Sequence, residues 1–227
     1  MHDTYGSQLT ELSTQLGHMA GLASAALRRA TQAVLSADAA LAQQVSRDHE
    51  QIAGMSLRAQ RAAFTLLTVQ APVVCDLRAI VSTIQIGADL NGMGSLALHI
   101  ADIARRRHPE HAVPVEMRCH VDQMGRLAAE LGGKTQTVLL PGGPHETATI
   151  HAGHATMDAL HRQLSTIVMG GPVWKHGVTA AVDVTLLSRY YEHFGGHAVE
   201  VARRVTTQST GASPDQQHLA TVGGIKG

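Results

Sequence analysis

The sequence predicts an all-α fold, organised as a tandem repeat of two three-helix bundles with six long helices. Apolar residues recur at helical spacing along every long segment, and strand-type alternation is absent. Aromatic residues make up only 3% of the chain, so the core has to be built from Ala, Val, Leu, Ile and Met. Such a core favours closely packed helices over a β-sandwich, whose strands are rich in aromatic and β-branched residues. The third observation is an apolar stripe that occurs twice in the chain at a fixed offset.

The repeated stripe indicates an internal duplication. Its first copy advances in steps of 4, 3, 4, 3 and 4 residues, and adding 101 to each number gives a second copy that is again wholly apolar. The two copies are Ile86, Leu90, Met93, Ala97, Ile100 and Ala104, and Leu187, Tyr191, Phe194, Ala198, Val201 and Val205. Earlier segments align more weakly at an offset of 105, for example Met19 with Met124 and Ile52 with Met157. We therefore expect two related bundles in tandem.

Proline and capping residues separate the expected helices. Four prolines each precede a long helical pattern, as proline does at the first helical position: Pro72, Pro114, Pro144 and Pro172. Ser36 and Asp38 provide a further break between two helical patterns. The expected helices are 4–35, 38–70, 72–107, 114–140, 144–169 and 172–207.

This order of helices predicts three segments. Residues 1–110 form the first three-helix bundle, and residues 111–207 form the second. Residues 208–227 are polar and rich in glycine, so we expect a mobile C-terminal tail.

Charge and cysteine content exclude several classes of partner. The chain has 18 basic and 18 acidic residues and no long Lys/Arg run, so we expect no nucleic-acid binding. It lacks a signal peptide and an apolar run of about 18 residues, so we expect no membrane insertion. The two cysteines show no motif spacing and fit a reducing compartment, so we expect a cytoplasmic protein with buried free thiols.

The stretch Asn91-Gly92-Met93-Gly94 looks like a turn but lies inside the first apolar stripe. The stripe passes through it without losing phase, whereas a hairpin would reset the period. We therefore expect one continuous helix, in which each glycine costs about 1 kcal/mol relative to alanine. If Gly92 is exposed, Gly92→Ala should stabilise the protein by roughly 0.5–1 kcal/mol.

Two segments carry a family resemblance. QAPVVCDLRAIVSTIQIGADLNGMGSLALHIADIA is similar to the third-helix signature of the PhoU family of phosphate-uptake accessory regulators, a pattern like Q-x-P-x-x-x-D-L-R followed by (D/E)-L-E-R-I-G-D-x-A. LLSRYYEHFGGHAVEVARRV resembles the same family's L-x-R-x-x-E-R-x-x-D-H-A-V-x-I. The matching residues are Gln70, Pro72, Asp76, Leu77, Arg78, Asp89, Leu90, Gly94 and Ala97, and then Leu187, Arg189, Glu192, His197, Ala198 and Val199. The resemblance spans nearly the whole chain.

The resemblance implies a function and partners. It implies a regulator that contacts a phosphate ABC transporter and its sensor histidine kinase, and that signals phosphate sufficiency by restraining the phosphate-starvation response. It also implies a homodimer. The sequence lacks the motifs of nucleophilic hydrolases, phosphate-binding loops and di-iron bundle enzymes, so we expect no catalytic activity.

The chain departs from the family at the positions where carboxylates would bind metal. The family's Glu-x-x-x-Asp pair becomes Asn91 and Ser95 in the first half, and Glu192 and Gly196 in the second. Residues i and i+4 share one helical face, so each pair would present its side chains together. Since Asn91 and Ser95 carry no charge, we expect no multinuclear metal cluster in the first half.

Histidines offer replacement ligands in the second half. His154 and Asp158 share one face of the fifth expected helix, and Glu192 lies on the sixth. Imidazole and carboxylate ligate divalent cations and iron, so we expect at most one weakly bound ion, held by Glu192, Asp158 and His154. His193 and His197 are candidate helpers. The alternative is that these histidines face solvent on amphipathic helices. Two classes of protein therefore remain: a regulator that acts through protein contacts, and a metal-binding helical bundle.

Overall fold

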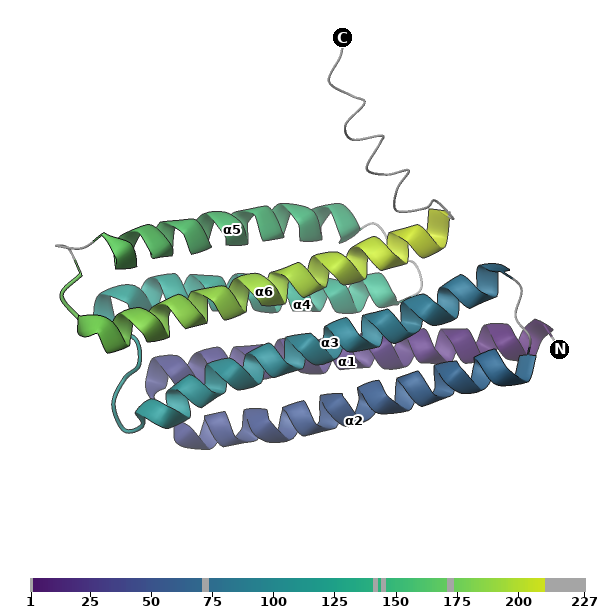
Figure 1. Ribbon diagram of the computed structural model, residues 1–227, viewed down its shortest axis with the longest axis horizontal. Coiled ribbons are helices and arrows are strands. Elements are labelled where there is room, and N and C mark those ends of the chain that lie inside the picture. The colour runs from purple at the N-terminus through teal and green to yellow at the C-terminus, as the bar shows by residue number, and fades with distance from the viewer. Residues whose placement is uncertain (1, 71–73, 141–142, 144–145, 171–173, 211–227) are drawn as a thin grey trace, which may run out of the picture.

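The computed structural model describes residues 2–70, 74–140, 143, 146–170 and 174–210 (Figure 1). Over these residues the chain forms six α-helices and one 3-10 turn, and contains no strand. They are α1 (His2–Ser36), α2 (Ala39–Gln70), α3 (Val74–Arg107), η1 (Val115–Met117), α4 (Arg118–Leu139), α5 (Thr147–Met169) and α6 (Gly177–Thr210). The predicted all-α fold with six helices is confirmed.

The six helices lie roughly parallel to one long axis, with α3 and α6 antiparallel in front and α1 and α4 behind them (Figure 1). Helices α2 and α5 form the two edges of this arrangement. Helix α1 packs against α2, α3 and α4, and α6 packs against α3, α4 and α5. The two halves of the chain therefore meet along two helix pairs, α1 with α4 and α3 with α6.

The repeated apolar stripe forms the centre of the core. All six stripe residues on α3 are buried, and so are five of the six on α6, where Val205 is partly buried. Buried residues from both halves belong to one continuous cluster. The predicted stripe is thus confirmed, and the two halves of the chain share one core. The boundary predicted at residue 110 falls between α3 and η1, while the division into two domains stays a prediction.

The starts of the fourth and sixth helices differ from the prediction. A 3-10 turn follows Pro114, and α4 begins only at Arg118. Helix α6 begins at Gly177, whose φ of 78° lies in the left-handed region that glycine adopts without steric cost. The indole Nε1 of Trp174 donates a hydrogen bond to the Gly177 carbonyl oxygen at 2.8 Å. This bond closes a turn where the sequence predicted helix.

The end of α6 also differs from the prediction. The helix continues to Thr210, so the tail predicted from residue 208 begins at least three residues too early. Gln208 Nε2 donates to the carbonyl oxygen of Ala79 on α3 at 3.3 Å, which ties this last turn to the first half. Residues 211–227 of the predicted tail lie outside the described residues, as do Pro72, Pro144 and Pro172.

Small residues allow α1 and α4 to approach closely. A Cβ placed on Gly125 of α4 would lie 2.4 Å from Thr31 Cγ2 of α1, so only glycine fits there. The Thr31 hydroxyl hydrogen bonds with the buried Tyr191 hydroxyl of α6 at 2.9 Å. Burial raises the pKa of Tyr191 well above its ordinary value, and the hydrogen bond to Thr31 opposes that rise. The close approach of α1 to α4 therefore places Thr31 where it can hydrogen bond with the buried hydroxyl of Tyr191.

The contact of α3 with α6 explains the glycine in the Asn91-Gly92 stretch. Helix α3 is continuous there, as predicted. His197 of α6 lies over Gly92, because a Cβ added to Gly92 would be only 2.7 Å from His197 Nε2. His197 Nδ1 is 3.1 Å from the carboxylate of Asp89 on α3, which also accepts a hydrogen bond from Arg204 Nε at 3.0 Å. The gain in stability expected from Gly92→Ala required an exposed Gly92, but this residue is half-buried.

Gly92→Ala is expected to leave the free energy of unfolding unchanged or lower. The gain in helix propensity, about 1 kcal/mol, is offset when the new methyl group displaces His197 from Asp89. Gly133→Ala in α4 is the matched control, because nothing lies within 4 Å of its added Cβ, and it should gain roughly 0.5–1 kcal/mol. In a His197→Ala background, the gain from Gly92→Ala should return. Urea unfolding measures all four variants, and a full gain from Gly92→Ala alone would contradict the proposed contact.

Candidate functional site

The structure brings together the three side chains that the sequence singled out in the second half. His154 and Asp158 lie one turn apart on α5, and Glu192 lies on α6, which packs against α5. One ligand atom from each residue lies within 4.8 Å of the other two, and all three residues are half-buried. Among the residues that the structure describes, no other group of three His, Cys, Asp or Glu side chains converges in this way.

A glycine on α6 allows His154 to reach this position. A Cβ added to Gly195 would lie 2.9 Å from His154 Nδ1, so a larger residue there would push the imidazole away. The Nε2 atom of His154 lies 3.7 Å from Asp158 Oδ1. Gly196 also borders the ring, since its added Cβ would lie 4.0 Å from His154 Cε1. The family's carboxylate at position 196 is thus replaced by a glycine that leaves space beside the imidazole.

Glu192 has two further neighbours on its own helix. Its Oε2 atom accepts a hydrogen bond from Arg189 Nη1 at 2.7 Å and lies 3.6 Å from His193 Nε2. Partial burial lowers the pKa of His193, and the positive charge of Arg189 lowers it further. A lowered pKa means that the imidazole of His193 is mostly neutral near pH 7. The carboxylate of Glu192 therefore faces one permanent cation, Arg189, and one largely uncharged ring.

The two histidines proposed as helpers, His193 and His197, are not among the three converging residues, and His161 of α5 has a different partner. His197 points to Asp89 across the α3–α6 contact and does not join the three converging residues. His161 Nδ1 lies 2.7 Å from the hydroxyl oxygen of the buried Ser188. His193 touches Glu192 but is not one of the three residues whose ligand atoms converge.

The corresponding place in the first half has a different chemistry. Asn91 and Ser95 lie on α3 as predicted, and the Ser95 hydroxyl donates back to the carbonyl oxygen of Asn91 at 3.1 Å. The Asn91 Oδ1 and His49 Nδ1 atoms are both buried without a hydrogen-bond partner in the described residues. His49 stands on α2 where His154 stands on α5, at the offset of 105. Spacing within α2 alone does not relate His49 to His154, whereas the offset of 105 between the two halves pairs them.

The ligand set of the second half suits a single divalent cation. One imidazole and two carboxylates are used for zinc, manganese and iron, and three protein ligands leave a coordination position open. Ligands about 2.0–2.2 Å from a tetrahedral ion are roughly 3.3–3.6 Å apart, so the present spacing would contract on binding. The half-buried side chains can make that adjustment by small rotamer changes.

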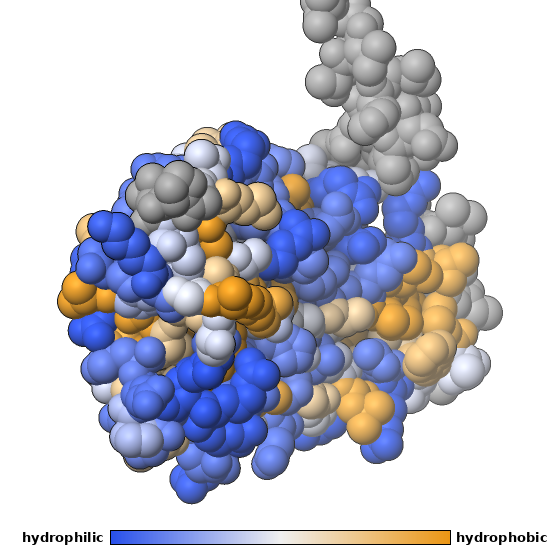
Figure 2. All heavy atoms as spheres, turned by 60° about the vertical axis from the view of Figure 1, so that its left-hand side comes forward, coloured by the Kyte–Doolittle hydropathy of each residue, from blue (hydrophilic) through white to orange (hydrophobic). Residues whose placement is uncertain are grey.

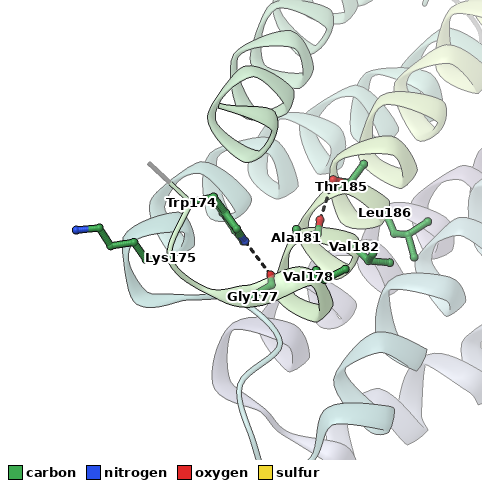
Figure 3. Close-up of a pocket in the computed structure, with 8 residues that line it drawn as sticks. All are labelled: Trp174, Lys175, Gly177, Val178, Ala181, Val182, Thr185 and Leu186. Carbon is green, nitrogen blue, oxygen red and sulfur yellow. Dashed lines mark hydrogen bonds between the residues drawn. The ribbon is translucent and has the colours of Figure 1, made fainter. Parts of the chain in front are cut away.

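A second feature is an apolar cavity of about 520 Å³ at the start of α6 (Figure 3). Trp174 and Lys175 border it on the connecting segment, and Val178, Val182 and Leu186 border it on the helix. Val178 is 81% exposed and Val182 is 50% exposed, which is unusual for large apolar side chains at successive helical turns. In Figure 2, hydrophobic residues form separate patches between polar areas on this side of the molecule.

The first half carries an equivalent apolar pair. Leu77 and Val81 lie 101 positions before Val178 and Val182, on the first turns of α3, and they are 45% and 42% exposed. Both pairs belong to the helical face that begins apolar and then carries Asn91 or Glu192. The duplication therefore presents the same exposed apolar element once in each half.

Comparisons with known proteins identify the family of this chain. The PhoU domain family matches residues 16–104. The phosphate-specific transport system accessory protein PhoU homolog 2 of Mycobacterium tuberculosis is 58% identical, over 94% of this chain and 100% of that protein. PhoU homolog 1 of the same organism is 43% identical, over 97% of this chain and 100% of that protein. The fold is that of PhoU from Pseudomonas aeruginosa, whose crystal structure aligns with a TM-score of 0.79 at 22% identity, over 92% of this chain and 100% of that one.

The six-helix all-α fold, in which α3 and α6 bury the same apolar stripe, is that of a PhoU-type helical protein. At this level of identity and coverage, the chain belongs to the PhoU family. Among the described residues, none of the helices has the length and hydropathy that a membrane span requires. Cys119 is exposed, so the expectation of a buried thiol is wrong for this residue.

Glu192→Ala is expected to abolish or strongly weaken any metal binding by the purified protein. The change removes one of two carboxylates and leaves His154 with Asp158, too few ligands for a stable site. Elemental analysis after purification without added metal should find at most one ion per chain in the natural protein. Glu200→Ala, on the same helix and outside the site, is the control. Two or more tightly held metals per chain, unaffected by Glu192→Ala, would show that other ligands do the binding.

Proposed function

We propose that this chain is a cytoplasmic, non-enzymatic regulator of phosphate uptake and of the phosphate-starvation response. It acts by contact with a phosphate ABC transporter and its sensor histidine kinase, as a negative regulator and as a homodimer. The names of its relatives support the phosphate-transport role, since they are called phosphate-specific transport system accessory proteins.

The observation that carries the contact mechanism is the exposed apolar pair on each half. Burying one Val or Leu side chain contributes roughly 1.5–3 kcal/mol, and these four residues remain substantially exposed in the chain. Exposed apolar surface bordered by polar residues is typical of protein-interaction sites. The cavity beside Val178 and Val182 would accept an apolar side chain of a partner, with Lys175 at its edge.

A second candidate function is cation binding by the second half. The converging side chains of His154, Asp158 and Glu192 favour it. The two functions are compatible, because the cation site and the apolar pair occupy different turns of α6.

Deleting the gene in its host is expected to raise transcription of phosphate-uptake genes when phosphate is plentiful. Complementation with the natural gene should restore repression, while a Val178→Glu, Val182→Glu double variant should fail to do so. Two buried carboxylates in the contact would be strongly unfavourable. Thr179→Glu adds a charge at an exposed neighbouring position and should complement. Circular dichroism checks that the variants fold, and unchanged phosphate-responsive transcription in the deletion strain would contradict the regulatory function.

A further inference from the structure

We propose that Arg189 is the built-in counter-ion of the candidate cation site and sets its affinity, because Arg189 and a bound cation compete for the carboxylate of Glu192. The inference rests on the cation-binding function proposed above. It assigns to Arg189 the role of a competitor that makes cation binding weak and reversible.

The geometry places the guanidinium and the cation site on the same carboxylate. Arg189 Nη1 is 2.7 Å from Glu192 Oε2, and Glu192 is also one of the three converging ligands. The side chain of Arg189 is 54% exposed, whereas that of Glu192 is 17% exposed. The carboxylate is therefore held by its surroundings, while the arginine can swing into solvent. A cation at the site and Arg189 at its present position would repel each other over a few ångströms.

The charges around the site also indicate that Arg189 weakens cation binding. Asp158 and Glu192 supply two negative charges, and the guanidinium of Arg189 offsets one of them. A divalent cation thus meets a net charge of about one negative unit where the ligands alone would present two.

The two halves of the chain differ at both positions together. At the offset of 101, Arg189 corresponds to Ala88 and Glu192 corresponds to Asn91. The half that has the carboxylate also has the arginine, and the other half has neither. The occurrence of both residues in the same half agrees with Arg189 neutralising part of the charge of Glu192.

The competing explanation is that Arg189 and Glu192 form only a helix-stabilising surface pair. Helix α6 provides a matched control for it, because Arg203 Nη2 lies 2.7 Å from Glu200 Oε2 at the same separation of three residues. Neither Arg203 nor Glu200 belongs to the three converging residues. A purely structural role predicts the same behaviour for both pairs.

The test is the affinity for Mn²⁺, measured by isothermal titration calorimetry on the full chain. Mn²⁺ suits carboxylate ligands, and the many histidines elsewhere in the chain bind it less tightly than they bind Zn²⁺. Arg189→Gln should tighten Mn²⁺ binding roughly two- to five-fold, the size expected for an exposed ion pair. Arg203→Gln should leave the affinity unchanged, and Glu192→Gln should abolish binding. The difference between Arg189→Gln and the natural protein should shrink as salt is raised, because salt screens the exposed arginine.

A second measurement follows Arg189 itself. In a protein labelled with ¹⁵N-arginine, Mg²⁺ should shift the Nε signal of Arg189 and leave that of Arg203 in place, since binding releases only the guanidinium of Arg189. Urea unfolding checks that the variants fold. Mn²⁺ binding that is unchanged or weakened in Arg189→Gln, with binding retained in the natural protein, would overturn this inference alone. No binding of Mn²⁺ by the natural protein would overturn the cation-binding function, and the inference with it.

Discussion

Helices α3 and α6 lie antiparallel against each other, and each buries a copy of the same apolar stripe in the shared core. Polar contacts then fix how the two helices face one another: His197 and Arg204 reach Asp89, and Arg107 reaches the buried Asp183. Gly92 makes this contact possible, because any side chain there would occupy the position of the His197 ring. This contact, together with the packing of α6 against α4 and α5, sets the orientation of α6. Helix α6 carries the candidate cation ligand Glu192, its neighbour Arg189, and the exposed pair Val178 and Val182. Both candidate functions therefore depend on the placement of α6.

Much of the fold could be predicted because the apolar residues recur at helical spacing along the sequence. The apolar stripe passes through Asn91 and Gly92 in phase, and the structure confirms both the helix and the burial of the stripe. The helix ends were less predictable, because the start of α6 is decided by a tertiary detail. Trp174 bonds the Gly177 carbonyl oxygen, and proline position alone does not encode that turn. The extension of α6 to Thr210 likewise depends on the contact of Gln208 with α3, a residue distant in sequence.

The candidate site was predictable in its members and less so in its surroundings. Helical spacing placed His154 beside Asp158, and packing of the last two helices brought Glu192 to them. The roles of Gly195 and His197 were not readable from spacing, because each depends on what the opposite helix presents. A glycine in the sequence shows only that a side chain is missing. The structure shows that His154 occupies the space beside Gly195 and that His197 occupies the space beside Gly92.

The two halves of this chain have diverged unevenly, and the pattern of divergence separates packing from function. The buried stripe stays apolar in both halves, as expected where a polar side chain would cost several kcal/mol without a partner. Positions 91 and 192, and 95 and 196, differ in charge and size, so shared ancestry alone does not preserve a residue type on this helical face. Yet positions 77 and 178, and 81 and 182, stay large and apolar although they are substantially exposed and packing of the chain does not require it. A contact made by both halves outside the chain would account for the retention of these four exposed apolar residues, and the regulator proposed above requires such a contact.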